Sequence, residues 1–128
     1  MSLKFLSPAL AAGLLFVSPV VAHAHGSMEP QHGGAVQMSG ETMIEFLPSP
    51  QGFRVWVSEE DEPLPANAFD ARATVTAADG TKKSYPMQAG AGNLLTAAGA
   101  RAPSGAKVDI ALRAKSNAAM SFGSFRVR

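Results

Sequence analysis

The strongest constraint on the fold is a repeated pattern of short apolar segments separated by turn residues. Turn signals recur about every 8–12 residues after Gly40, and no segment beyond this point shows a helical period. The predicted strands are 41–47, 53–57, 71–77, 82–87, 94–97, 107–113 and 120–127. About seven short strands are typical of an all-β domain. We therefore predict an immunoglobulin-like β-sandwich, with a small open β-barrel as the alternative, because strand number alone does not separate the two.

Two of these segments carry more detailed predictions. Asp79-Gly80 lies between two strands, and this dipeptide predicts a hairpin closed by a two-residue type I′ turn. The last segment changes parity around Gly123, so that Met120 and Phe122 align with each other but not with Phe125. A β-bulge at Gly123 would restore one inward face and place Met120 in the core.

The N-terminus has the three parts of a secretory signal peptide. Lys4 precedes an apolar run over 5–21, and Ala22-His23-Ala24 supplies small residues at a cleavage junction. The run is interrupted by prolines and is shorter than the approximately 20 apolar residues of a membrane span. We predict cleavage after Ala24, with cleavage after Ala22 as the alternative, and no membrane insertion of the mature chain.

Composition limits what the mature chain can bind. Removal of 24 of the 128 residues leaves 104, enough for one small domain. Lys4 is the only charged residue removed, so the formal charge falls from +1 to zero. Without a basic stripe, neither nucleic acid nor an anionic membrane is an expected partner. Cysteine is absent, which excludes disulfides and thiolate metal sites.

All three histidines lie close together near the predicted cleavage junction. His23, His25 and His32 are followed by none further along the chain. Residues 25–34 are rich in Gly, Ser, Pro, Gln and His, which predicts a flexible leader. The expected organisation is a signal peptide over 1–24, this leader, and a β-sandwich domain over 35–128.

Several short motifs occur in an order that resembles a known group of proteins. They are His32-Gly33-Gly34, Ile44-Glu45-Phe46, Val55-Trp56-Val57, Asp79-Gly80 and Gly92-Asn93-Leu94. In this order the chain resembles small periplasmic HGG-motif proteins, and domains of periplasmic adaptor subunits, associated with heavy-metal efflux and copper handling in Gram-negative bacteria. The resemblance covers nearly all of residues 32–127. It implies a periplasmic protein that binds or passes on copper or a similar cation, with an efflux-pump adaptor as a partner. The implied site falls most directly on His32.

The leader contains groups that can ligate a metal ion. If cleavage leaves His25 first, its α-amine and ring Nδ1 can chelate Cu(II), and His32 can add a third nitrogen. Planar nitrogen sets select Cu(II) or Ni(II), whereas the thioethers of Met28 and Met38 suit Cu(I). Cleavage after Ala22 would instead place His25 third, where it forms a square-planar chelate with amide nitrogens. We predict His25, Met28, His32 and Met38 as metal ligands, with copper as the ion and Ni(II) or Zn(II) as alternatives.

The residues of the predicted metal site, and those near it, also have simpler interpretations. The histidines can be incidental to an exported interaction module, and Met38 and Met43 can be core residues. Trp56 either packs over a second face or stacks near the site. The acidic run 58–62 lacks the spacing of a calcium loop and is expected to be a solvated loop. With no histidine in 35–128 to activate a serine, we do not expect an enzyme; a copper oxidase is the weakest alternative.

Overall fold

The computed structural model describes Gly13 and residues 28–128. The predicted signal peptide, apart from Gly13, and His25 therefore lie outside the described residues. Nine strands and one short 3-10 helix follow each other along the chain. They are β1 Ala35–Ser39, β2 Thr42–Ser49, β3 Gly52–Glu59, β4 Glu62–Pro63, η1 Ala66–Ala68, β5 Phe69–Thr76, β6 Lys82–Ala89, β7 Leu94–Ala98, β8 Lys107–Ala114 and β9 Met120–Arg126. Within the described part of the chain, no helix is long and apolar enough to cross a membrane.

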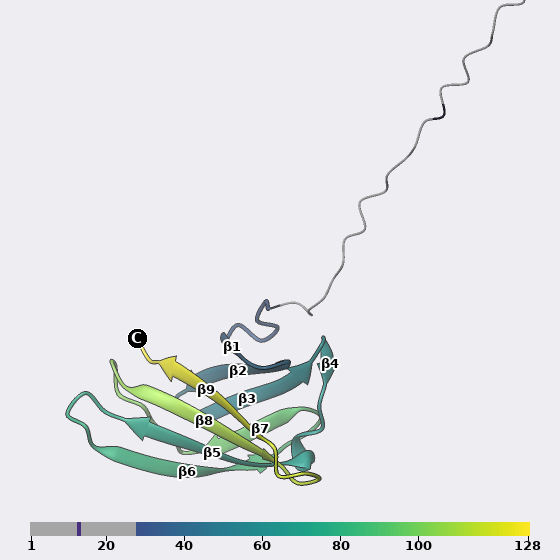
Figure 1. Ribbon diagram of the computed structural model, residues 1–128. Helices are drawn as coiled ribbons and strands as arrows, with labels where there is room; N and C mark the ends of the chain where they lie inside the picture. Colours follow the sequence, from purple (N-terminus) through teal and green to yellow (C-terminus); the bar gives the residue numbers. More distant parts are fainter. Residues whose placement is uncertain (1–12, 14–27) are drawn as a thin grey trace, which may run out of the picture.

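All nine strands belong to one antiparallel sheet. The order is β1-β2-β3-β7-β6-β5-β8-β9, and β4 pairs with the end of β3. The sheet curls until β9 passes in front of β2 and β3 (Figure 1), and the N–H of Phe122 donates to the hydroxyl of Ser39 on β1 at 3.1 Å. The all-β prediction is confirmed. Because one path of pairing runs through the whole sheet, the architecture is a nearly closed barrel, the alternative given for the fold.

The core fills the inside of this curled sheet. Alternate residues of the long strands point inward, as expected for a strand with one buried face. Phe46 meets Phe53 edge-on with ring centroids 5.2 Å apart, and its centroid lies 5.1 Å from that of Phe125. These rings bring β2, β3 and β9 together, and burial of each contributes about 1.5–3 kcal/mol to stability. The largest fully buried side chains are Phe53, Ile44, Leu95, Ile110, Leu112, Glu45, Val55, Val57 and Val108.

Strand β9 keeps a single register along its whole length. Every residue from Met120 to Arg126 has one partner on β8, so the predicted bulge at Gly123 is wrong. Gly123 faces inward, and a Cβ there would lie 2.9 Å from the ring of Phe125, which fills the space that a side chain would take. Met120 and Phe122 consequently face outward, 48% and 60% exposed. The predicted place of Met120 in the core is also wrong.

Two hairpin turns differ from their predictions. The hairpin at Asp79-Gly80 is confirmed, but of these two residues only Gly80 has positive φ, at 88°. A type I′ turn needs positive φ at both central residues, so that turn type is wrong here. A two-residue connection with both φ values positive does occur between β3 and β4, at Glu60 (49°) and Asp61 (66°). The acidic run expected to be a solvated loop is therefore a tight hairpin.

Candidate functional site

The strongest candidate site lies on the outer face of β2 and β3. Glu45 and Trp56 are direct cross-strand partners, and both point away from the core, since their neighbours in sequence point inward. Despite facing outward, Glu45 is only 1% exposed and Trp56 only 9%. Outward residues can be this deeply buried only where another segment covers the sheet, and here residues 31–34 contact them.

The carboxylate of Glu45 fixes the path of this covering segment. It accepts the backbone N–H groups of Gln31 at 2.9 Å, His32 at 2.8 Å and Gly34 at 2.9 Å. The Nδ1 atom of His32 lies 3.1 Å from the Oε1 atom of Glu45. The leader was predicted to be flexible over 25–34, but its last four residues are held to the sheet by one buried side chain.

The protonation state of Glu45 determines which ring nitrogen of His32 carries a proton. Burial raises the pKa of Glu45. The hydrogen bonds from the N–H groups of Gly34 and Gln31, and from the ring and N–H of His32, lower this pKa by more than burial raises it. The net pKa lies below the ordinary value of 4.5. An ionised carboxylate only accepts hydrogen bonds, so Nδ1 of His32 must carry the proton. In the neutral ring this leaves a lone pair on Nε2.

Each glycine of the His-Gly-Gly motif has a separate structural reason. Gly33 has φ of 78°, in the region that L side chains rarely adopt. Gly34 passes so close to β2 that a Cβ would lie 2.5 Å from the carbonyl oxygen of Phe46. The motif therefore combines a turn that needs glycine, a close approach that needs glycine, and the histidine that both of them position.

The indole of Trp56 fixes the plane of the histidine ring. The two rings are stacked with centroids 3.9 Å apart and an angle of 1° between their planes. The Cζ atom of Arg54 lies 5.5 Å from the centroid of the Trp56 ring. The His32 side chain is thus held on one face by the indole and at Nδ1 by Glu45, while 40% of it remains exposed. Of the two interpretations of Trp56, stacking at the site is the one that the structure shows.

Methionine side chains lie on the same outer face. Met38 of β1 and Met43 of β2 are direct cross-strand partners, which places their Cβ atoms about 5 Å apart. Met43 is two residues from Glu45, so the two side chains share one face of β2. Met43 is 8% exposed and Met38 is half-buried, whereas Met28 is 61% exposed. The structure therefore brings His32 and Met38 to one face and leaves Met28 at the surface.

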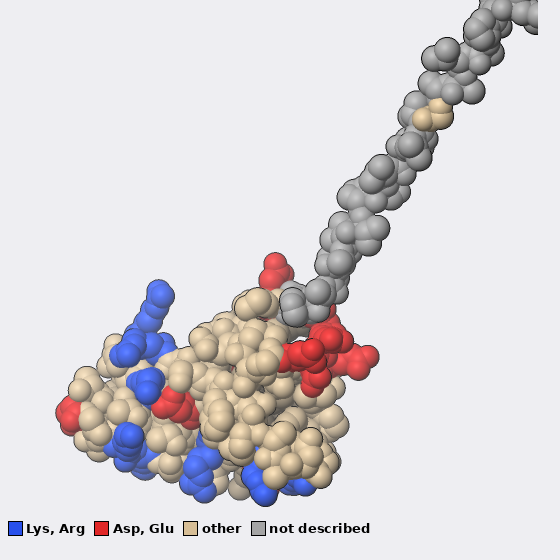
Figure 2. Space-filling view, in the orientation of Figure 1, with Lys and Arg blue, Asp and Glu red and all other residues tan. Residues whose placement is uncertain are grey.

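Acidic residues concentrate at the end of the sheet where this methionine pair lies. Figure 2 shows acidic side chains gathered at the tip where β3 and β4 meet, while Lys and Arg side chains spread over the left and lower parts of the view. The acidic residues are Glu59, Glu60, Asp61 and Glu62. Glu59 is the cross-strand partner of Thr42, which directly precedes Met43. A local concentration of negative charge raises the concentration of cations near it.

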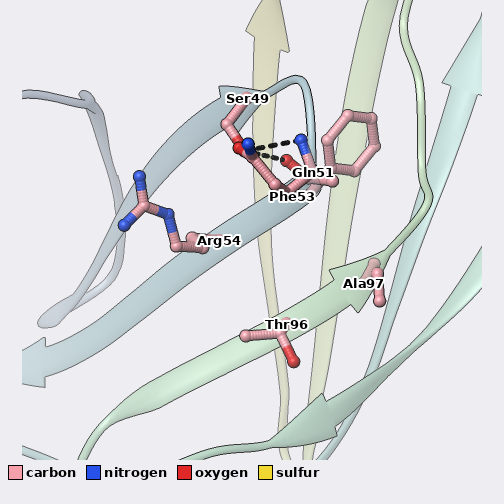
Figure 3. A pocket seen from close by; sticks show the side chains of 8 residues that line it. Ser49, Gln51, Phe53, Arg54, Thr96 and Ala97 are labelled. Carbon is pink, nitrogen blue, oxygen red and sulfur yellow. Dashed lines mark hydrogen bonds between the residues drawn. The ribbon is translucent and has the colours of Figure 1, made fainter.

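Two other hollows lack a comparable set of groups. One lies at the β2–β3 turn, where the Ser49 hydroxyl donates to the Gly52 carbonyl at 3.1 Å and accepts the Gln51 N–H at 3.3 Å (Figure 3). The only charged residue among the described residues that line it is Arg54. The other, of about 590 Å³, lies at the gap between β1 and β9 over the ring of Phe125, and the charged residues that line it are arginines.

The sequence pattern indicated His32 but not Glu45. A single glutamate in an apolar strand normally projects into solvent, and no residue near Glu45 in the sequence shows that a segment eleven or more residues earlier covers it. Among residues 28–128, no group of three or more His, Asp or Glu side chains is placed to hold a metal ion. A metal at His32 would therefore need thioether ligands or His25, which lies outside the described residues.

Comparisons with protein-family models, with curated proteins and with solved structures found no match to this chain.

Proposed function

We propose that this chain is a periplasmic copper-binding protein that carries or buffers the ion for an efflux system. The observation that carries the proposal is the position of His32: its Nδ1 lies 3.1 Å from the buried carboxylate of Glu45, so that Nε2 of the neutral ring is left with a lone pair. Histidines that ligate metals commonly donate their other ring N–H to a carboxylate, which fixes the tautomer and orientation. The signal peptide predicted from the sequence, and the resemblance centred on His32, support the same proposal.

The neighbouring donor atoms favour copper over other ions. Imidazole suits Cu, Zn and Ni, whereas thioethers select Cu(I) among the ions considered. Met38 and Met43 form a thioether pair on the face that holds Glu45 and His32, and Met28 is exposed four residues before His32. We therefore propose Cu(I) on His32 with Met38, and Cu(II) where His25 contributes its amine and ring. An adaptor subunit of an efflux pump is the proposed recipient.

Metal titration of protein with a verified N-terminus tests this proposal. Cu(I) affinity is measured by competition with a chromophoric chelator, and Cu(II), Ni(II) and Zn(II) affinities are measured by calorimetry. His32→Ala is expected to weaken copper binding at least tenfold, because it removes a ligand. Met38→Leu is expected to weaken Cu(I) binding selectively. Met120→Leu, which removes an exposed thioether from the outer face of β9, is the matched control and is expected to leave affinity unchanged.

The role of Glu45 provides a second readout. Glu45→Gln keeps His32 in the chain but removes the charge that fixes its tautomer, and we expect a loss of copper affinity of about 10–100-fold. Unchanged copper affinity in both His32→Ala and His25→Ala would exclude the proposed site. An exported interaction module would then be the better description, and the exposed side chains of Met120 and Phe122 favour it as the second candidate.

A further inference from the structure

The gap between β1 and β9 leaves one edge of each strand without a partner strand among the described residues. There β1 pairs with β2 alone, and β9 pairs with β8 alone. Ala35 and Gln37 are the cross-strand partners of the buried Phe46 and Ile44, so they lie on the inward face of β1, but both are exposed. The interior of the curled sheet is therefore open to solvent along this edge.

The free edge of β9 presents backbone hydrogen-bonding groups to the gap. The N–H of Val127 donates at 2.9 Å to the segment that leads into β8, whereas the N–H of Phe122 points the other way, toward β1. Successive N–H groups of a strand point to opposite edges, so those of Ser124 and Arg126 also face the gap. No backbone carbonyl of the described residues accepts either of them. A further strand could pair with this edge.

A hollow of about 590 Å³ lies in this gap, and we call it the β1–β9 groove. Ala35 lines it on one side and residues 125–128 line it on the other. The rings of Phe46 and Phe125, whose centroids are 5.1 Å apart, also line it. The hydrogen bond to Ser39 closes the gap at the far end of β1. The groove thus combines an apolar lining with a free sheet edge.

The charged residues that line the β1–β9 groove are Arg126 and Arg128. The Nη1 atom of Arg126 donates to a backbone carbonyl, that of Gly105, at 3.3 Å, rather than to a carboxylate. Asp109 lies on the adjacent strand, but its carboxylate accepts the hydroxyl of its cross-strand partner and lies 3.4 Å from Nζ of Lys107. The rim of the groove is therefore positively charged, which favours acidic groups in a segment that binds there.

We infer that the β1–β9 groove binds an extended segment of another protein, in which apolar side chains alternate with acidic ones. A free sheet edge recognises the backbone of an added strand, and pockets beside it select alternate side chains. Side chains of that strand that point inward meet Phe46 and Phe125, and those that point outward lie beside Arg126. The inference does not depend on copper, because the hydrogen bonds come from the strand edges and the charge from two arginines.

A short synthetic peptide tests the inference. The probe is a fluorescein-labelled seven-residue peptide of alternating valine and glutamate, and fluorescence anisotropy measures its binding to the purified chain. The same peptide with lysine in place of glutamate is expected to bind about tenfold more weakly, because it places like charges beside the arginines. A valine–glutamate peptide with N-methylated amides keeps every side chain but cannot pair with a strand, and it is expected not to bind.

Two substitutions at one position test the edge of β9. Ser124→Pro removes the N–H that faces the gap and leaves the pairing with β8 in place, so it is expected to weaken peptide binding about tenfold. Ser124→Ala removes the hydroxyl but keeps this N–H, and as the matched control it is expected to leave binding unchanged. Circular dichroism verifies that both variants fold.

A pair of double variants tests the charge of the rim. Arg126→Ser/Arg128→Ser is expected to weaken binding of the valine–glutamate peptide about fivefold. Arg72→Ser/Arg113→Ser removes the same charge from exposed positions on β5 and β8 that do not line the groove, and it is expected to leave binding unchanged.

Amide hydrogen exchange of the wild type provides a readout that needs no variant. Bound peptide is expected to slow exchange at Ser124 and Arg126, whose N–H groups face the gap. No binding up to about 1 mM peptide, equal binding of the N-methylated peptide, or unchanged exchange at these two amides would overturn the inference. A concentration-dependent dimer that the peptide dissociates would identify a second copy of the chain as the occupant and would overturn it as well.

Discussion

At the scale of single residues, Glu45 determines the structure of the candidate site. It lies on an outward strand position, but three backbone N–H groups and one ring nitrogen surround it. His32 could be identified from sequence because histidine is rare in this chain and lies beside two glycines. Glu45 could not, since its burial depends on a contact between segments more than ten residues apart.

The first prediction concerns the pH dependence of stability. Because the folded-state pKa of Glu45 lies below 4.5, its contribution to the free energy of unfolding is present above pH 4.5 and is lost as pH falls through the folded pKa. Glu45→Gln is expected to lower the free energy of unfolding at pH 7 by about 1–3 kcal/mol. The reason is that it removes the buried negative charge that accepts hydrogen bonds from residues 31–34. The difference from wild type should shrink below pH 4.5, as measured by urea unfolding at stepped pH.

The matched control is Glu41→Gln. Glu41 is exposed in the turn between β1 and β2, so its substitution is expected to change the free energy of unfolding by less than about 0.5 kcal/mol. A Glu45→Gln difference that stayed constant from pH 7 to pH 3 would contradict the role assigned to the carboxylate.

At the scale of elements, the alternation of apolar and polar residues predicted most strands. It failed in the last strand, where the alternation changes parity around Gly123. The seven predicted strands are present, and β1 and β4 are additional. β4 has only two residues, too few to show a period. At Gly123 the expected bulge rested on the assumption that Phe122 belongs inside. The ring of Phe125 instead fills the space beside Gly123, a packing relation that the alternation of residue types does not contain.

The hairpin between β3 and β4 leads to the second prediction. Glu60 and Asp61 both have positive φ, which strains L side chains, and Asn-Gly is the pair best suited to a type I′ turn. Replacing Glu60-Asp61 by Asn-Gly is expected to raise the free energy of unfolding by about 1 kcal/mol. Thermal unfolding measures the change.

The control for this turn separates conformation from charge. Glu59→Gln/Glu62→Gln removes two negative charges from the same hairpin but alters neither residue with positive φ. If this control stabilised the chain as much as Asn-Gly does, relief of charge repulsion rather than relief of backbone strain would be the cause.

At the scale of the whole molecule, the order of strands depends on contacts that no local pattern specifies. The all-β class follows from alternation and turn residues, whereas the distinction between sandwich and barrel depends on whether β6 also pairs with β7. The pairing of Gln88 with Thr96 makes the sheet continuous, and neither residue type indicates it. Closure remains incomplete, since β1 and β9 are joined in the described structure by one hydrogen bond through Ser39.

The incomplete closure leads to the third prediction. Of the described strands, β1 pairs with β2 alone, whereas β5 pairs with both β6 and β8. Amide hydrogen exchange is therefore expected to be faster in β1 than in the centre of β5, because strands with fewer partners open at lower free energy. Ser39→Ala should accelerate exchange in β1 without changing β5.

Ser104→Ala, in an exposed loop, is the matched control for this variant and should alter neither strand. Equal protection of β1 and β5 in the wild type would show that β1 and β9 are joined more strongly than by the single hydrogen bond through Ser39.

The stacking of His32 on Trp56 gives the molecule an internal optical reporter. Trp56 is the only tryptophan in the chain, so its fluorescence comes from one place, the surface covered by residues 31–34. Release of that segment would expose the indole to water and shift its emission to the red, while a copper ion held at Nε2 would quench it at close range. Attachment of the leader and loading of the ion would thus give different spectral changes without an added label.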